Sequence, residues 1–315
     1  MKLSEVSYYQ TGGLCKEWHE PKNLVELQES MEAIKGQPWF LLGAGSNSLV
    51  MDTEWFGAVL SLRSMTQIES TELGAVFGAG CVNSDVSEFA YQKEWAGGEF
   101  LYRLPGQLGG TVRMNARCYG GEIGRIARKV WTVDVHSRIK IWESPQECFK
   151  GYKDTVFMQE PLVVAQAELG FFNGRQSVIR QKMDFCEQDR IQKGQFLHPS
   201  CGCVFKNCYQ AEVSVPSGML LEHAGVIGMT HGGAVVSPQH ANFVYNKNDA
   251  TSREILELTL MMREKVWDAF GVWLEYEMEV LGSIPLDLKT AVSEKRAPQY
   301  SVKALQELRD LFKKR

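Results

Sequence analysis

The chain has 315 residues, of which 44% are hydrophobic and 23% charged, with 34 Lys and Arg against 38 Asp and Glu and a net charge of −4. This composition is typical of a folded globular protein and excludes a disordered or collagen-like chain. The slight acidic excess argues against a nucleic-acid-binding protein, for which we would expect a clustered basic surface.

Neither a membrane span nor a signal peptide is visible. No apolar run approaches the roughly 18 residues that cross a bilayer, and residues 1–8 lack the apolar centre of a signal peptide. We therefore expect a cytoplasmic protein whose eight cysteines are reduced thiols. Three of them lie in the pattern Cys201-x-Cys203-x4-Cys208, just after His198. A Cys-x-Cys spacer with no second ligand pair argues against zinc, so we expect no metal.

Hydrophobic periodicity predicts alternating helices and strands over the first 190 residues. A helix over 23–34 is expected to begin at Asn23, and a second helix over 82–95 at Asn83 or Ser84. Strands are predicted over 38–42, 57–62, 75–80, 130–135 and 162–169. A polar helix over 176–192 follows and is expected to join two domains.

The second half begins around residue 199 and contains an amphipathic helix over 252–270. Thr251 and Glu254 have the spacing of a capping box at its start. A strand over 273–281 should place Glu275, Glu277 and Glu279 on one face. The leucines after residue 301 recur at helical spacing and predict a final helix that docks on the protein.

Glycine is enriched, with 29 residues or about 9% of the chain against ~7% on average. The loop Gly43-Ala44-Gly45-Ser46-Asn47-Ser48 follows a predicted strand, where main-chain amides can approach a phosphate. It is neither a G-x-G-x-x-G motif, because Ser48 replaces the third glycine, nor a Walker loop, because it lacks the lysine. Tight turns are the alternative, but several such loops within 125 residues favour a long phosphorylated ligand.

Seven motifs, taken together and in order, resemble the UDP-N-acetylenolpyruvoylglucosamine reductase family. They span roughly residues 10 to 283 and read GAGSN at 43–47, PGQLGG at 105–110, NARCYGGE at 115–122, YKDT at 152–155, PSCGCVFKN at 199–207, GGAVVSPQHANF at 232–243 and FGVWLEYE at 270–277. One such motif would be weak evidence, but this ordered set is specific.

The resemblance implies an α/β (α+β) fold: a two-lobed FAD-binding domain of the vanillyl-alcohol-oxidase type plus a smaller α/β substrate-binding domain. We expect lobe 1 over 1–66, lobe 2 over 67–190, the substrate-binding domain over 191–284 and a helical tail over 285–315. FAD would be the cofactor and NADPH the hydride donor. The substrate would be an enolpyruvyl sugar nucleotide, reduced to UDP-N-acetylmuramate for peptidoglycan synthesis, by a protein acting as a monomer.

The resemblance also assigns site residues. The FAD pyrophosphate would be held around Gly43, Ala44, Gly45, Ser46, Asn47 and Ser48, and the isoalloxazine ring would lie near Gly109, Gly110 and Asn115. Tyr152, Lys193 and Asn207 would bind the substrate. The catalytic positions would be Cys203, Lys153 and Glu277.

Two catalytic positions depart from the family pattern. Cys203 stands where the family has a serine proton donor, and a thiol with an ordinary pKa near ~8.5 can serve as an acid. Lys153 replaces an arginine and keeps its charge but loses the two-pronged fit to a carboxylate. Arg117 either supplies the missing guanidinium or faces solvent.

Plainer interpretations stand beside these assignments. Cys203 could be a small core thiol, Lys153 an exposed lysine and Glu277 part of a solvated acidic stripe. His240 and Asn242 fit turn or core hydrogen bonding as well as ligand binding. Two other functions remain open: a related FAD oxidoreductase with another acceptor, and a catalytically decayed flavin- or sugar-nucleotide-binding protein.

Overall fold

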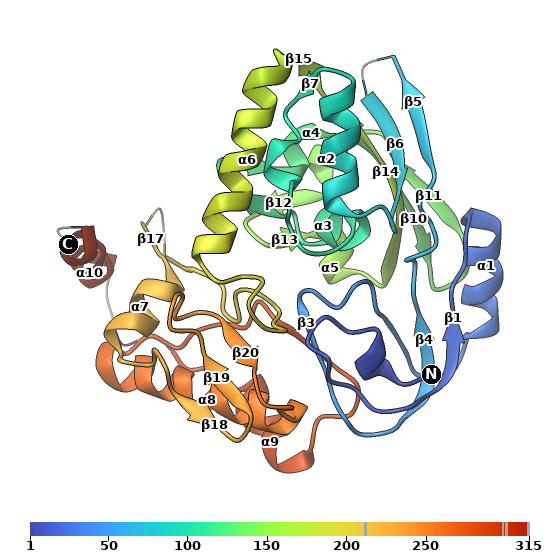
Figure 1. Cartoon of the computed structure of the whole chain (residues 1–315). Coiled ribbons are helices and arrows are strands. Elements are labelled where there is room, and N and C mark those ends of the chain that lie inside the picture. Colours follow the sequence, from blue (N-terminus) through green and yellow to red (C-terminus); the bar gives the residue numbers. More distant parts are fainter. Residues whose placement is uncertain (73, 211–212, 298, 300–301, 314–315) are drawn as a thin grey trace. The chain divides into compact units, whose positions relative to one another are not determined.

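The computed structural model describes residues 1–315 except 73, 211–212, 298, 300–301 and 314–315. Two compact units can be distinguished, and the chain passes between them more than once (Figure 1). Unit 1 contains Met1, Cys15–Ala44 and Phe56–Arg190; unit 2 contains Lys2–Leu14, Gly45–Trp55 and Ile191–Arg315. Among the described residues, no helix is both long enough and apolar enough to cross a membrane.

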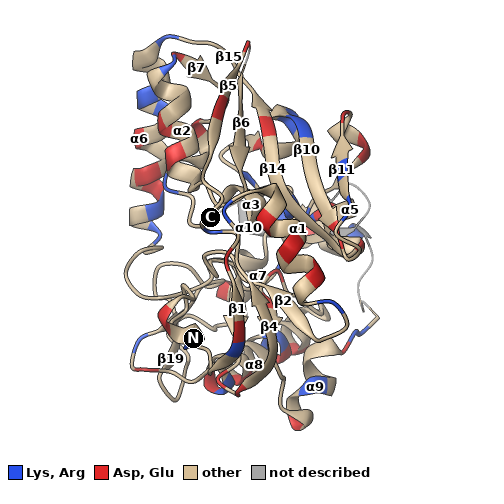
Figure 2. Ribbon diagram, turned by 90° about the vertical axis from the view of Figure 1, so that its right-hand side faces the viewer, with Lys and Arg blue, Asp and Glu red and all other residues tan. Residues whose placement is uncertain are grey.

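The largest sheet of unit 1 is antiparallel, with the strand order β11-β10-β14-β6-β5 (Figure 2). Its strands are β5 (Ile68–Thr71), β6 (Gly74–Gly78), β10 (Ala127–Asp134), β11 (Ile139–Trp142) and β14 (Leu162–Gly170). A smaller sheet has the order β1-β4-β2, with β1 (Cys15–His19), β2 (Trp39–Leu41) and β4 (Trp55–Leu60). The five strands predicted for this half are thus all present, within a few residues of the expected bounds.

The large sheet is covered by helices on both sides. Val163 and Ala165 of β14 pack into a core with α1 (Leu24–Ala33), whereas Val164 packs into a core with α2 (Asn83–Gln92) and α3 (Leu108–Arg113). Alternate side chains of a strand point to opposite faces, so both faces of β14 are apolar. This arrangement fixes the loops before α2 and α3 at the ends of the strands.

Local signals explain where α1 and α2 begin. Asn23 caps α1 as predicted, accepting a hydrogen bond from the Glu26 amide. The predicted cap of α2 is wrong: Val82 is its N-cap. Asn83 is instead buried, where its side chain donates to the Leu104 carbonyl and accepts from the Thr111 hydroxyl. The asparagine thus links loops and leaves the helix end without a side-chain cap.

The rest of unit 1 consists of short hairpins and α6. The helix α6 (Gln176–Gln192) has the predicted bounds, and its buried residues Ile179 and Met183 pack on Ala96. The short elements are β7 (Trp95–Ala96), β8 (Arg117–Cys118), β9 (Gly121–Glu122), α4 (Ile123–Ile126), β12 (Phe149–Gly151), β13 (Asp154–Thr155), α5 (Val156–Gln159) and β15 (Phe172–Asn173).

Unit 2 is built around α8 (Ser252–Phe270), which has the predicted bounds. Ile255, Leu258 and Met262 are fully buried in its core. The other elements are β3 (Ser48–Val50), β16 (Cys208–Gln210), β17 (Val213–Val215), α7 (Ser217–His223), β18 (Thr230–His231), β19 (Ala234–Val236), β20 (Val244–Asn246), β21 (Glu279–Leu281), α9 (Leu286–Ser293) and α10 (Val302–Lys313).

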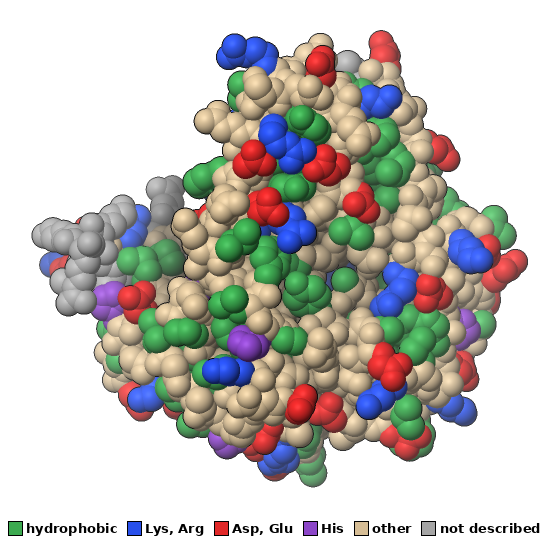
Figure 3. Space-filling model, viewed as in Figure 1, with side chains coloured by type: hydrophobic (Ala, Val, Ile, Leu, Met, Phe, Trp, Pro, Cys, Tyr) green, Lys and Arg blue, Asp and Glu red, His purple; other side chains and the backbone are tan. Residues whose placement is uncertain are grey.

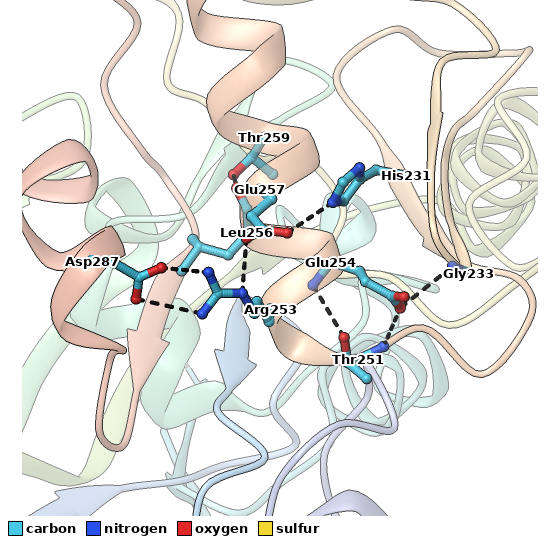
Figure 4. A network of polar contacts seen from close by, with 9 residues as sticks. All are labelled: His231, Gly233, Thr251, Arg253, Glu254, Leu256, Glu257, Thr259 and Asp287. Atoms are coloured by element: carbon cyan, nitrogen blue, oxygen red, sulfur yellow. Dashed lines mark hydrogen bonds and ion pairs between the residues drawn. The ribbon is translucent and has the colours of Figure 1, made fainter.

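A polar network surrounds the start of α8 (Figure 4). Thr251 and Glu254 form the predicted capping box, and the Glu254 carboxylate also accepts from the Gly233 amide. In the same turn, Arg253 pairs with Glu257 and Asp287, linking α8 to α9. Through these contacts, the first turn of α8 holds both the loop that contains Gly233 and the segment that follows β21.

The strand predicted over 273–281 is regular only at β21 (Glu279–Leu281). There it pairs in parallel with β3, with Glu279 opposite Ser48. Residues 273–278 instead make single bridges, such as Phe205 with Tyr276. The expectation that three glutamates share one strand face is therefore wrong for Glu275 and Glu277. The final helix is confirmed as α10, and its Leu305 is fully buried in the core of unit 2.

Candidate active site

The glycine loop at 43–48 requires glycine at a defined place. Gly45 has φ +70°, and a Cβ there would lie 3.0 Å from the Tyr8 nitrogen and 3.1 Å from the Ser7 Cα. A larger residue would be strained by both its backbone conformation and this contact. Gly43 is less constrained by contact, since its added Cβ would meet only the Gln107 side-chain oxygen, at 3.2 Å.

Main-chain donors in this loop are available to a ligand. Within the described part of the chain, the amides of Ala44, Gly45 and Asn47 donate to no protein acceptor, whereas the Ser48 amide donates to the Gly45 carbonyl at 3.2 Å. Successive amides in a glycine turn form a site for an anion. The loop therefore fits the diphosphate of a dinucleotide cofactor.

The same loop is tied to the segment that carries Glu277. The Asn47 side chain donates to the Glu277 carbonyl at 2.9 Å, and the Glu279 amide donates to the Asn47 carbonyl at 2.9 Å. Ser48 then begins β3, which pairs with β21. Unit 2 thus brings Asn47, Ser48 and Glu277 together, although they are far apart in sequence.

Gly109 and Gly110 lie in the first turn of α3, in unit 1. The Gly109 amide donates to the Ala79 carbonyl at 2.9 Å, and a Cβ on Gly109 would lie 2.8 Å from the Ala79 Cβ. A Cβ on Gly110 would meet nothing within 4 Å. Gly109 thus allows α3 to approach β6, and Gly110 presents an open main-chain surface.

Asn115 holds two loops of unit 1 together. It is 2% exposed and has φ +45°. Its side chain donates to Glu122 at 2.8 Å and to the Gly151 carbonyl at 3.2 Å, and it accepts from the Gly124 amide at 3.1 Å. With both ends of its amide group used by the protein, Asn115 orients the loops rather than offering a free side chain.

Tyr152 and Lys153 occupy the tight turn between β12 and β13, directly after Gly151, whose carbonyl accepts from Asn115. Lys153 has φ +53°, an uncommon conformation for a residue other than glycine. Thr155 is fully buried, and its hydroxyl donates to the Arg113 carbonyl at 2.6 Å. Unit 1 therefore brings Asn115 and the Tyr152-Lys153 turn together. Arg117, the other candidate cation, is exposed on β8.

Cys203 and Glu277 lie on adjoining backbone segments of unit 2. Cys203 is partly exposed and forms a bridge with Phe243. The next residue, Val204, donates to the Asn242 carbonyl at 3.0 Å and accepts from the Glu277 amide at 2.8 Å. The main chain therefore positions the thiol and the carboxyl-bearing residue next to one another.

Asn242 and His240, for which ligand binding and core contacts were both possible roles, contact other residues of the protein. Asn242 is 1% exposed; its side chain accepts from the Phe205 amide and donates to the Ser217 hydroxyl. His240 stacks on Phe243, with ring centroids 4.2 Å apart. Both residues thus support the segment beside Cys203, as the core interpretation expected.

Two of the residues expected to bind the substrate, Asn207 and Lys193, lie in unit 2. Asn207 accepts a hydrogen bond from the Ser217 amide at 3.1 Å, at the start of α7, which leaves its NH2 group for a ligand. Lys193 is exposed, just after α6. Among the described residues, no group of three His, Cys, Asp or Glu residues is arranged to hold a metal.

Gln107 was missed by the sequence analysis. Its side-chain nitrogen donates to the Gly80 carbonyl at 3.1 Å, and its oxygen lies against Gly43. It thereby links two glycine loops of unit 1. Its position inside the PGQLGG motif was the available signal.

Comparison with known proteins defines the class. Residues 19–135 match the FAD binding domain, and residues 192–281 match the C-terminal domain of UDP-N-acetylenolpyruvoylglucosamine reductase. The protein is therefore an FAD-dependent oxidoreductase, and the expected fold class is confirmed. FAD is its cofactor, and the amides of Ala44, Gly45 and Asn47, which donate to no acceptor in the described part of the chain, fit that assignment.

Individual relatives identify the family. The chain is 36% identical over 284 residues to the UDP-N-acetylenolpyruvoylglucosamine reductase of Methylococcus capsulatus, covering 89% of this chain and 91% of the relative. It is 33% identical over 279 residues to that of Thermotoga maritima, covering 89% and 96%. The crystal structure of the Thermus caldophilus enzyme superposes with a TM-score of 0.72 at 26% identity, covering 89% and 97%. The chain belongs to the UDP-N-acetylenolpyruvoylglucosamine reductase family.

Proposed function

We propose that this protein uses NADPH to reduce UDP-N-acetylglucosamine enolpyruvate to UDP-N-acetylmuramate, a precursor of peptidoglycan, in the cytoplasm. The observation that carries the proposal is the pairing of the Val204 and Glu277 main chains, which holds Cys203 beside Glu277 within the matched C-terminal domain. The relatives that share this domain carry that reductase activity in their names.

FAD would be held by main-chain amides at residues 43–48, with its ring near Gly109, Gly110 and the loop that Asn115 orients. When bound, FAD would supply the hydride transfer from NADPH to the β-carbon of the enolpyruvyl group. The remaining tasks fall to this chain's own residues, since hydride addition leaves negative charge on the substrate's carboxylate-bearing carbon.

Cys203 would hold the proton that is delivered to the α-carbon, acting as a general acid. Lys153 would place a positive charge toward the substrate carboxylate, although with a single-point rather than a two-pronged contact. Glu277 would act as a second hydrogen-bonding group beside the thiol. Tyr152, Lys193 and Asn207 would bind the sugar nucleotide, with the lysine charge directed to its diphosphate.

The spectrum of the purified protein tests the proposal. We expect yellow protein whose flavin absorbance bleaches on adding NADPH under anaerobic conditions and returns on adding the enolpyruvyl substrate. A colourless protein that cannot be loaded with FAD would overturn the proposal. Reoxidation at equal rates by unrelated acceptors would favour a related oxidoreductase with another substrate.

A separate experiment tests whether the protein has lost its catalytic activity, because Cys203 and Lys153 depart from the family pattern. If the parent protein binds FAD but does not turn over, and the double variant C203S/K153R does, decay is the correct account. Turnover by the parent protein excludes it.

A further inference from the structure

Two thiols flank Gly202 in unit 2. Cys201 is 3% exposed, whereas Cys203 is partly exposed. Gly202 between them has φ +72°, in the left-handed region, so the chain turns at this point. One buried and one accessible thiol are thus joined by a glycine turn.

The spacing of the two residues suits a covalent bond between them. Two residues of extended chain span at most about 7 Å, and a turn at the middle residue shortens that span. Disulfides join Cα atoms about 4.4–6.8 Å apart. A Cβ on Gly202 would meet only the Gln195 side-chain nitrogen, at 3.9 Å, so the turn has space to adjust.

Electrostatics support the proximity of the two thiols. Burial raises the pKa of the Cys201 thiol strongly, and a negative charge on Cys203 raises that pKa further. Cys201 also contacts the buried Tyr9 side chain. Cys201 therefore stays a protonated, shielded thiol, while Cys203 is the one that a solute can reach.

We propose that Cys201 and Cys203 form a reversible disulfide when the protein meets hydrogen peroxide, and that this bond switches off proton delivery by Cys203. The inhibitory half of this proposal rests on the proposed function. The formation of the bond does not, because it depends only on the two thiols and the turn between them.

The reaction balances as a two-electron oxidation. The Cys203 thiolate attacks peroxide, the O–O bond breaks, and a sulfenic acid forms with release of hydroxide. The Cys201 sulfur then attacks the Cys203 sulfur and displaces its hydroxyl group, which leaves as water together with the Cys201 proton. Two thiols and one hydrogen peroxide thus give one disulfide and two waters. A dithiol reductant reverses the bond by exchange.

Digestion with trypsin places both cysteines in one peptide, whose mass shows whether they are bonded. The peptide over 194–206 contains Cys201 and Cys203 and no other cysteine, because cleavage follows Lys193 and Lys206. We would treat the FAD-loaded protein with hydrogen peroxide in the absence of NADPH, block free thiols and measure this peptide by mass spectrometry. We expect it to be two hydrogens lighter and unalkylated. Substrate reduction should fall about tenfold or more, and both changes should reverse together with dithiothreitol.

Variants separate the possible products. C208S removes the other cysteine of this region and should leave the oxidised 194–206 peptide unchanged. In C201A, peroxide should drive Cys203 to sulfinic or sulfonic acid, so that dithiothreitol no longer restores activity. C201S serves the same purpose with a side chain of similar size that can keep the hydrogen bond to Tyr9, and it guards against poor folding of C201A.

Several outcomes would overturn the proposal: sulfinic acid as the main product in the parent protein, a disulfide to Cys208, or a peptide that stays fully alkylated. A disulfide that forms without any loss of substrate reduction overturns the switch and, with it, the catalytic role of Cys203. If the parent protein has no reductase activity, only the proposed function is overturned. The disulfide can still be tested, because the mass of the peptide shows whether the bond forms.

Discussion

The thiol of Cys203 is held in place by the main chain on either side of it. Its own backbone bridges to Phe243, and Val204 bonds to both Asn242 and Glu277. Substitution at 203 can therefore remove the sulfur without removing the contacts that fold this segment.

C203A should lower the rate of substrate reduction about 10²–10⁴-fold, the usual contribution of a general acid. Flavin reduction by NADPH should change little, because that half-reaction needs no proton from Cys203. Rapid mixing of the FAD-loaded protein with each partner separately measures the two rates. C208A is the matched control, and an equal loss in both half-reactions would show that C203A disturbs folding or cofactor binding instead.

Single residues also show the limit of sequence analysis. The structure brings Glu277 next to Cys203, but nothing local in the sequence predicts that Asn242 bonds across to Phe205 or that Asn207 accepts from Ser217. Asparagine suits turns, caps and ligands alike. Only the contacts made by folding decide among these roles, and the ligand contacts of the site residues stay predictions.

Among the elements, α8 shows why helix boundaries can be predicted from the sequence, because its signals are local. Thr251 accepts from the Glu254 amide at 3.2 Å, and Glu254 accepts from the Thr251 amide at 2.9 Å (Figure 4). At the other end, Gly271 ends the helix with φ +65°. The segment before β21 lacks such signals, so a strand pattern there gave a wrong interpretation.

T251A should destabilise unit 2 by about 1 kcal/mol, because it leaves the first turn of α8 without a side-chain acceptor. Thermal and urea unfolding of the FAD-loaded protein measure the loss. T251S keeps the hydroxyl and is the matched control. Equal stability of T251A and the parent protein would show that the cap contributes nothing to the fold.

The turn between β10 and β11 should make unit 1 sensitive to acid. Partial burial of Asp134 opposes its ionisation, but hydrogen bonds from Arg138 and from the His136 amide outweigh it and lower the carboxyl pKa to about 2. Since this folded-state pKa lies below the ordinary value near ~3.9, the stabilisation is complete above about pH 4 and is lost as the pH falls toward 2.

D134N should therefore cost about 1 kcal/mol at pH 7, a modest value because solvent screens the site. Between pH 4 and 2 its stability should fall less steeply than that of the parent protein. Urea unfolding at a series of pH values measures both slopes. E143Q, which changes a more exposed carboxyl group in the same region, is the control. Parallel curves for D134N and the parent protein would contradict the assigned pKa.

In the molecule as a whole, distant segments combine in ways that the sequence pattern does not reveal. The β3 strand at 48–50 pairs with β21 at 279–281, so unit 2 contains residues from both ends of the chain. Local periodicity carries no information about such partners. The ordered motifs indicated the FAD-binding and C-terminal domains, but the division at 66, 190 and 284 and the monomeric state stay predictions.

On the face drawn in Figure 3, acidic and basic side chains are interspersed.

The segment after β21 completes unit 2 by satisfying a buried charge. Arg263 on α8 is 2% exposed, and burial lowers the pKa of its guanidinium. Its side chain donates to the carbonyls of Ala291, Val292 and Glu294 at 3.1–3.3 Å and lies 4.1 Å from the centre of the Trp273 ring. A buried cation without acceptors is costly, so these three carbonyls are essential partners.

A chain ending at Ser283 should lose at least about 3–5 kcal/mol, because it removes the carbonyl partners of Arg263 and also the buried side chains of Leu288 and Leu305. A chain ending at Ala297 keeps the acceptors and measures the contribution of α10 alone. Adding R263L to the shorter chain removes the stranded charge and should restore part of the stability, whereas R263L in the full chain should destabilise it. Equilibrium unfolding of the four combinations gives the coupling energy between the arginine and the segment. A coupling near zero would show that the tail acts only by covering apolar surface.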